Sequence, residues 1–258
     1  MSVQGEGIAL GGIPTPVSTL NVTENGTYAP SAGAAYNVVN VNVEQPFSFV
    51  VQGSGSFTTS GDINVNFGDT SSDYSGNNQT VNFSYSDEKA HRIVVTGTLK
   101  KILFTRCVGL LSVDVPFPKS MAQVGSFSTC FASCTSLANI PSGLFDNCVL
   151  AGVFTLCFAD CSSLSAIPDG LFDRVDHSYD NMHSCFYGCA ALKTIPEGLF
   201  DGMDITDCYR CFEDCTSLTG PAPELWDETK WPNITSYSGC FASCTGLSNY
   251  ADIPSDWK

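Results

Sequence analysis

The C-terminal part of the chain repeats one pattern of apolar positions. A cysteine and a phenylalanine are followed at fixed distances by a second cysteine and a leucine, which gives C-F-x-x-C-x-x-L. Copies begin at Cys130, Cys157, Cys185, Cys211 and Cys240, at steps of 26 to 29 residues. A fixed period of this length is typical of stacked repeats, so the pattern predicts a solenoid whose units bury their apolar side chains against one another.

Phe104-x-x-Cys107-x-x-Leu110 lacks the first cysteine and is expected to be the terminal unit, which makes about six units. Within a unit the apolar spacing predicts a stripe along a short helix of about two turns. An I-P-x-G-L-F-D segment such as 140–146 follows in three units and is expected to lead to the next one. The expected repeat core is Phe104, Cys107, Cys130, Phe131, Cys134, Leu137, Cys157, Phe158, Cys161, Leu164, Cys185, Phe186, Cys189, Leu192, Cys211, Phe212, Cys215, Leu218, Cys240, Phe241, Cys244 and Leu247.

Upstream of this repeat the apolar residues alternate with polar ones in short runs. The runs are 47–51, 63–67, 81–85 and 93–98, and clusters of Gly, Asn, Ser and Asp separate them. Alternation of this kind indicates strands with one buried face. We therefore expect a compact β-sandwich over residues 46–100.

The first 45 residues have a third character. Asn25-Gly26 is a strong turn signal, and 36–43 alternates as a strand does, so a small hairpin-like β module is expected behind an N-terminal arm. The predicted fold class is thus mainly β with short helices. Its three domains are 1–45 (attachment arm and β module), 46–100 (Ig/PKD-like sandwich) and 101–258 (cysteine-rich solenoid).

The composition limits the function classes. Charged residues make up only 14% of the chain, and the formal net charge is −15. Such a field repels nucleic acid, so nucleic-acid binding is not expected. No run approaches the roughly 18 apolar residues that a membrane span needs. Met1–Leu20 carries no Lys or Arg and no long apolar run, so a secretory signal is not expected either.

Thirteen cysteines raise the question of metal sites or disulfides. The C-x₃-C spacing is not that of a zinc knuckle, and each cysteine stands where the repeat needs a small apolar residue. A ladder of buried thiols is therefore the preferred interpretation, with disulfides between units as the alternative. Asp146, Asp173, Asp201 and Asp227 recur at one point of the unit and are interpreted as turn or cap residues rather than a calcium ladder. No residues are assigned to catalysis, a cofactor or a metal.

These motifs resemble known families. The repeat is similar to that of the BspA-like leucine-rich-repeat proteins of bacterial surfaces over roughly Phe104–Lys258. The runs 62–69 and 91–97 look like a divergent PKD-type sandwich. The phrase Val-Thr-Glu-Asn-Gly-Thr-Tyr at 22–28 is similar to short modules in tail-associated proteins of phages and prophages. That last resemblance implies a place in a virion.

The resulting hypothesis is a non-enzymatic structural protein of a phage virion, as a tail fibre or a head decoration. Residues 1–45 would attach it to other virion proteins, and the solenoid would bind a host-surface glycan or protein. A homo-oligomer is expected. The alternative is an adhesin at the bacterial cell surface, and an enzyme acting on polysaccharide lacks an identifiable catalytic set. The expected contact residues are Tyr179, Tyr187, Tyr209, Arg210, Trp226, Trp231 and Tyr237.

Overall fold

The computed structural model describes residues 2–3, 20–21, 45–175 and 180–258. The chain divides into two compact units, Met1–Pro46 and Phe47–Lys258. In the first, β1 (Ser2–Val3) pairs with β2 (Leu20–Asn21) in antiparallel fashion. The turn expected at Asn25-Gly26 and the strand expected at 36–43 lie outside the described residues.

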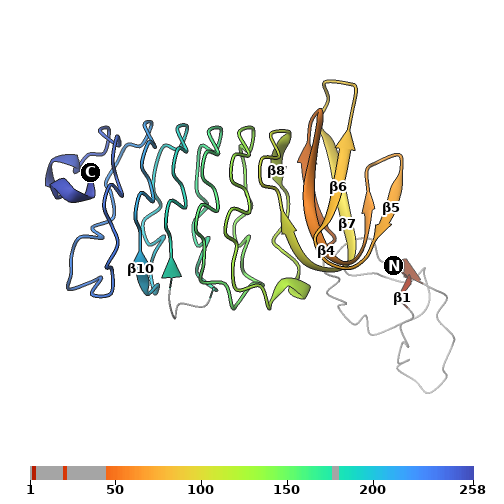
Figure 1. The fold of residues 1–258 in the computed structure, drawn as a ribbon, viewed down its shortest axis with the longest axis horizontal. Helices are drawn as coiled ribbons and strands as arrows, with labels where there is room; N and C mark the ends of the chain where they lie inside the picture. Colours follow the sequence, from red (N-terminus) through yellow and green to blue (C-terminus); the bar gives the residue numbers. More distant parts are fainter. Residues whose placement is uncertain (1, 4–19, 22–44, 176–179) are drawn as a thin grey trace, which may run out of the picture. The chain divides into compact units, whose positions relative to one another are not determined.

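The second unit confirms a mainly β protein with an antiparallel sheet and almost no helix (Figure 1). Six strands form the sheet in the order β5-β4-β7-β3-β8, with β6 also paired to β4. Their bounds are β3 (Phe47–Val51), β4 (Ser54–Asn66), β5 (Ser71–Tyr74), β6 (Gln79–Ser84), β7 (His91–Leu103) and β8 (Leu110–Val113).

The two long strands β4 and β7 approach each other closely where both carry a glycine. Gly61 and Gly97 have φ of 128° and 93°. A Cβ at Gly61 would lie 2.0 Å from the Thr98 oxygen, and one at Gly97 would lie 2.4 Å from the Asp62 oxygen. Only glycine fits this crossing, which coincides with a register shift between Ser60 and Gly61.

Residues 104–175 and 180–258 form a row of similar irregular coils, called here the stacked units (Figure 1). Backbone N–H groups of one unit donate to carbonyls of the next, as from Phe131 to Cys157 at 2.8 Å and from Phe158 to Cys185 at 2.8 Å. The short strands β9 (Asp180–Asn181) and β10 (Ile205–Asp207) pair in parallel between neighbouring units. Successive units therefore share their hydrogen bonds.

The prediction of a short helix in each unit is wrong. Thr129 and Ser133, two residues before and after Phe131, have φ of 58° and 59°, in the left-handed region. The segment is a series of tight turns, as in the bond of 3.0 Å from the Cys134 N–H to the Phe131 oxygen. Alternate N–H groups leave the segment for the next unit, which a helix would not allow. The only helical segments in the described residues are three 3₁₀ turns, η1 (Lys119–Met121), η2 (Tyr250–Asp252) and η3 (Ser255–Trp257).

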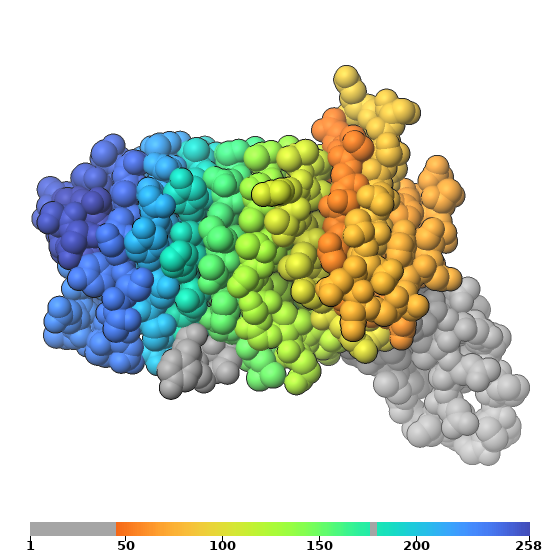
Figure 2. All heavy atoms as spheres, in the orientation of Figure 1, coloured from red at the N-terminus to blue at the C-terminus, as the bar shows by residue number. Residues whose placement is uncertain are grey.

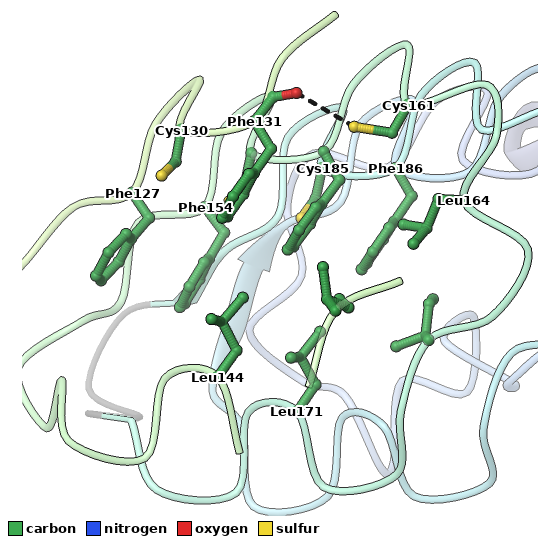
Figure 3. Close-up of a cluster of buried hydrophobic side chains, with 14 of the residues drawn as sticks. Phe127, Cys130, Phe131, Leu144, Phe154, Cys161, Leu164, Leu171, Cys185 and Phe186 are labelled. Atoms are coloured by element: carbon green, nitrogen blue, oxygen red, sulfur yellow. Dashed lines mark hydrogen bonds between the residues drawn. The ribbon is translucent and has the colours of Figure 1, made fainter. Parts of the chain in front are cut away.

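The centre of the stack is a ladder of six phenylalanine rings. Neighbouring rings lie 5.1–5.7 Å apart between centroids, with interplanar angles of 3–10°. Figure 3 shows this packing around Phe131 and Phe186, with a second row of rings at Phe127 and Phe154. The ladder consists of Phe104, Phe131, Phe158, Phe186, Phe212 and Phe241, and every member of the expected repeat core is buried.

The core continues from the stacked units into the sheet. The Phe104 ring meets the Phe49 ring of β3 edge-on at 4.8 Å, and one cluster of buried residues spans both parts. The expected boundary between residues 100 and 101 falls inside β7, and Phe47–Lys258 is one compact unit.

The last stacked unit is covered by the residues that follow it. The N–H of Phe241 donates to the Trp257 oxygen at 2.8 Å, and that of Gly239 to the Asp256 oxygen at 3.1 Å. The Trp257 side chain is buried and stacks on the Tyr237 ring at 4.6 Å. The η3 segment thus takes the place of a further unit.

Candidate binding surface

All thirteen cysteines are buried free thiols. The second cysteine of each motif donates its thiol to the carbonyl of the phenylalanine in the preceding unit, and Figure 3 shows the Cys161–Phe131 bond at 3.2 Å. The same bond recurs four times at 2.9–3.2 Å, from Cys134, Cys189, Cys215 and Cys244. These cysteines therefore link neighbouring units, because each is an apolar side chain that also donates a hydrogen bond.

Burial favours the neutral form of thiols such as Cys161 and Cys107. It raises the pKa of Cys161 to about 12 and that of Cys107 to about 11. A thiol is a poor nucleophile and metal ligand until it loses its proton. Among the described residues, no group of three His, Cys, Asp or Glu side chains is placed to hold a metal ion.

The recurring aspartates take part in turns. The N–H groups of Asp146, Asp173 and Asp201 each bond the carbonyl of a glycine three residues earlier, at 2.9–3.3 Å. Asp227 accepts hydrogen bonds from the N–H and the hydroxyl of Thr229, at 3.0 and 2.6 Å. These contacts are local, as expected of turn residues.

The outer face of the tight turns differs between units. One residue after the ladder phenylalanine, the first, second and last motif copies carry Ala132, Ala159 and Ala242, whereas the third and fourth carry Tyr187 and Glu213. Three residues before the ladder phenylalanine, the first, second and last copies carry Ser128, Thr155 and Ser238, and the third and fourth carry His183 and Tyr209. At these two positions, large aromatic and charged side chains are thus concentrated on two adjacent units, and the other units carry small residues. In Figure 2 successive units form a continuous surface.

Arg210 connects the two tyrosines. Its guanidinium carbon lies 5.9 Å from the Tyr187 ring centroid and 5.5 Å from the Tyr209 ring centroid. Glu213 pairs with its Nε, so the cation is held both by ring faces and by a carboxylate. We call Tyr187, Tyr209, Arg210 and Glu213 the tyrosine patch.

A polar network supports one side of the patch. The His183 ring stacks on the Tyr209 ring at 5.0 Å, and its Nδ1 lies 3.2 Å from Asp207 Oδ2. Asp207 Oδ1 accepts the Tyr209 N–H at 3.0 Å. Asn181 links Asp207 to Thr155 of the preceding unit, at 3.4 and 2.8 Å. Side chains from three units thus position the Tyr209 ring.

The patch lies in an acidic environment. Asp214, followed by burial and by Glu213 and Asp160, raises the pKa of Tyr187, and only Arg210 lowers it. Within the part of the chain that the structure describes, Asp160 and Asp214 have no ion-pair partner. The charges of Arg210 and Glu213 balance within the patch, so Asp160 and Asp214 make its surroundings negative.

The structure places the expected contact residues in different surroundings. Tyr187, Tyr209 and Arg210 come together in the patch. Trp226 and Tyr237 pack around Trp257, at 6.4 and 4.6 Å between ring centroids. Trp231 packs against the core, and Tyr179 lies outside the described residues. Sequence reasoning missed His183, Asp207, Asp160 and Asp214, which a position-by-position comparison of the five repeats would have singled out.

Comparison with known proteins found no match. No protein-family model matches the chain, and neither a curated protein nor a solved structure does so. In the described residues, no helix is long and apolar enough to cross a membrane.

Proposed function

We propose that this chain is a non-enzymatic binding protein of a phage virion, located on the tail or as a head decoration. In this proposal residues 104–258 are a leucine-rich-repeat solenoid of the BspA-like type, and the sheet formed by β3 to β8 is an Ig/PKD-like spacer. Residues 1–45 attach the chain to other virion proteins. The stacked units bind a protein or a glycan of the host surface, and the chain acts as a homo-oligomer.

The contrast between the inside and the outside of the stacked units carries this proposal. Inside, six rings and a row of thiols repeat almost unchanged from unit to unit. Outside, the positions one residue after and three residues before the ladder phenylalanine change from alanine, serine and threonine to tyrosine, glutamate and histidine in two units. Repeat proteins display binding residues in this way, because an outer side chain can vary without altering the core.

The test is to image phage or induced-prophage particles of the source strain by cryo-electron microscopy. Density for the stacked units at a defined site on the head or tail, with residues 1–45 against a neighbouring protein, is the expected result. It would also give the copy number and so the oligomeric state. Particles that lack the chain would refute the virion assignment.

The second candidate is an adhesin at the bacterial cell surface. The repeated C-F-x-x-C-x-x-L motif favours it, because the resemblance to bacterial surface proteins rests on that motif. Antibodies against the purified chain would label intact host cells if the adhesin proposal is right. They would label released particles, and not cells, if the virion proposal is right.

A further inference from the structure

We infer that the tyrosine patch binds a basic polypeptide segment of the partner protein, by taking a lysine or arginine side chain onto the ring of Tyr187 between Asp160 and Asp214. This inference rests on the proposed binding function and names the chemistry of its ligand. It commits to a protein partner and against a glycan.

The first support is that the patch already holds a cation of the chain itself. The Arg210 guanidinium lies within 6 Å of both tyrosine rings, the distance at which a ring face attracts a positive charge. Its side chain keeps 45% of its surface exposed, whereas its partner Glu213 keeps 15%. The rings and Glu213 thus already bind one cation, and this cation remains partly exposed to solvent.

The second support is the uncompensated charge beside the patch. Asp160 and Asp214 occupy the same position in two motif copies, two residues after the ladder phenylalanine, and have left-handed φ of 58° and 62°. The Asp160 N–H donates to the Tyr187 oxygen at 2.7 Å, and the N–H of Gly188, next to Tyr187, donates to the Glu213 oxygen at 2.8 Å, so Asp160 and Asp214 belong to the two segments that flank Tyr187. Both raise its pKa, and neither has an ion-pair partner among the described residues. A second cation at Tyr187 would be attracted by both.

The charges also separate the ligand classes. Phosphorylated, sulfated or carboxylated ligands are repelled by Asp160 and Asp214 beside the patch and by the formal net charge of −15. A neutral sugar could lie on a tyrosine ring but would leave the charges of Asp160 and Asp214 uncompensated. A basic segment uses the rings and the carboxylates together, and the field of the whole chain speeds its approach.

The experiment measures binding of the full chain to a short fluorescein-labelled oligolysine by fluorescence anisotropy, at ~0.15 M salt, where charges beyond ~8 Å are largely screened. Oligoglutamate of the same length and labelled dextran are the acidic and neutral probes. One variant, Y187S/Y209S, removes the rings without changing the charge. A second, D160N/D214N, removes two negative charges and keeps side chains that tolerate left-handed φ.

The matched control is D169N/E197Q. Asp169 and Glu197 are exposed residues of the P-x-G turns, away from the tight turns. This variant also loses two negative charges, so its net charge equals that of D160N/D214N. Circular dichroism and a thermal melt establish that each variant is folded. We expect oligolysine affinity to fall about tenfold in Y187S/Y209S and about fivefold in D160N/D214N, but less than about twofold in the control.

Equal losses in D160N/D214N and D169N/E197Q would overturn the site, because only the general field of the chain would then attract the probe. Binding of dextran that Y187S/Y209S abolishes, without binding of oligolysine, would overturn the ligand class in favour of a glycan. Neither result bears on whether particles contain the chain, so failure of the inference is distinct from failure of the proposed function.

Discussion

The phenylalanine ladder allows a quantitative test of what holds the stacked units together. Phe158 is fully buried and its ring contacts three others, stacked on Phe131 at 5.1 Å and on Phe186 at 5.4 Å and edge-on to Phe145 at 6.3 Å. Phe200 is also buried but, among the described residues, has a single ring partner, Phe212 at 6.1 Å. The same substitution at both sites therefore separates ring contacts from loss of volume.

The expected magnitude follows from the number of ring pairs. Leucine keeps most of the buried apolar area, so both substitutions lose about 1 kcal/mol through imperfect filling of the site. Each aromatic pair adds about 0.5–1.5 kcal/mol beyond its area. Phe158→Leu should thus lower the free energy of unfolding by roughly 2.5–5.5 kcal/mol, and Phe200→Leu by roughly 1.5–2.5 kcal/mol.

Urea unfolding followed by circular dichroism measures both values, provided that the slope with denaturant is the same for the two variants and the parent chain. Hydrogen exchange shows where the loss is felt, and we expect the units beside Phe158 to open first, because each unit contacts only its neighbours. Equal losses at the two positions would refute the reasoning. The ladder would then be a consequence of the repeat and not a source of its stability.

Three further predictions test other features. Buried thiols such as Cys161 and Cys107 have pKa values above those of the unfolded chain, so the folded state keeps protons that the unfolded state loses. Stability should therefore be full below about pH 8.5 and fall as the pH rises above it, and an unchanged urea midpoint between pH 7 and 9.5 would contradict this. Gly97→Ala should lower the free energy of unfolding by about 2–3 kcal/mol or more, because the new Cβ strains the backbone and clashes with the Asp62 oxygen. Gly68 has φ of 106° but open space around it, so Gly68→Ala measures the backbone strain by itself. Trp257→Ala should cost about 3–5 kcal/mol in a thermal or urea melt, and a loss below about 1 kcal/mol would show that the last unit needs no cover.

The buried positions of the repeat were predictable from sequence because they are periodic. Phe131, Cys134 and Leu137 recur at fixed spacing, and all three are fully buried. The local backbone was not predicted, because residues three apart share a face in a helix and also in consecutive tight turns. The sequence did contain the missing signal. In five units the position two residues after the ladder phenylalanine holds Ser133, Asp160, Gly188, Asp214 or Ser243, residues that suit left-handed φ or turns far better than a helix interior. In the first unit it holds Arg106, which also has left-handed φ.

The candidate surface was only partly predictable for a different reason. Tyrosine and tryptophan combine an apolar ring with a polar group, which suits them both to binding a partner protein and to covering the end of a repeat. Composition therefore could not separate Tyr187 and Tyr209 from Trp226 and Tyr237, which pack around Trp257. The roles of Asp160 and Asp214 depend on which side chains lie across the unit boundary, and a single unit of sequence does not contain that information.

The way the stack ends determines where a partner can bind. Every unit donates N–H groups forward, so the last unit would expose a row of donors that could pair with another chain. Asp256 and Trp257 accept those of Gly239 and Phe241, and at the other end β8 pairs with β3 of the sheet. Because both ends are paired within the chain, association by extending the stack is blocked, and specific contacts must come from side chains on its outer face. Substitutions at the tyrosine patch should therefore change binding with little change in stability, whereas substitutions at the ends should change stability first.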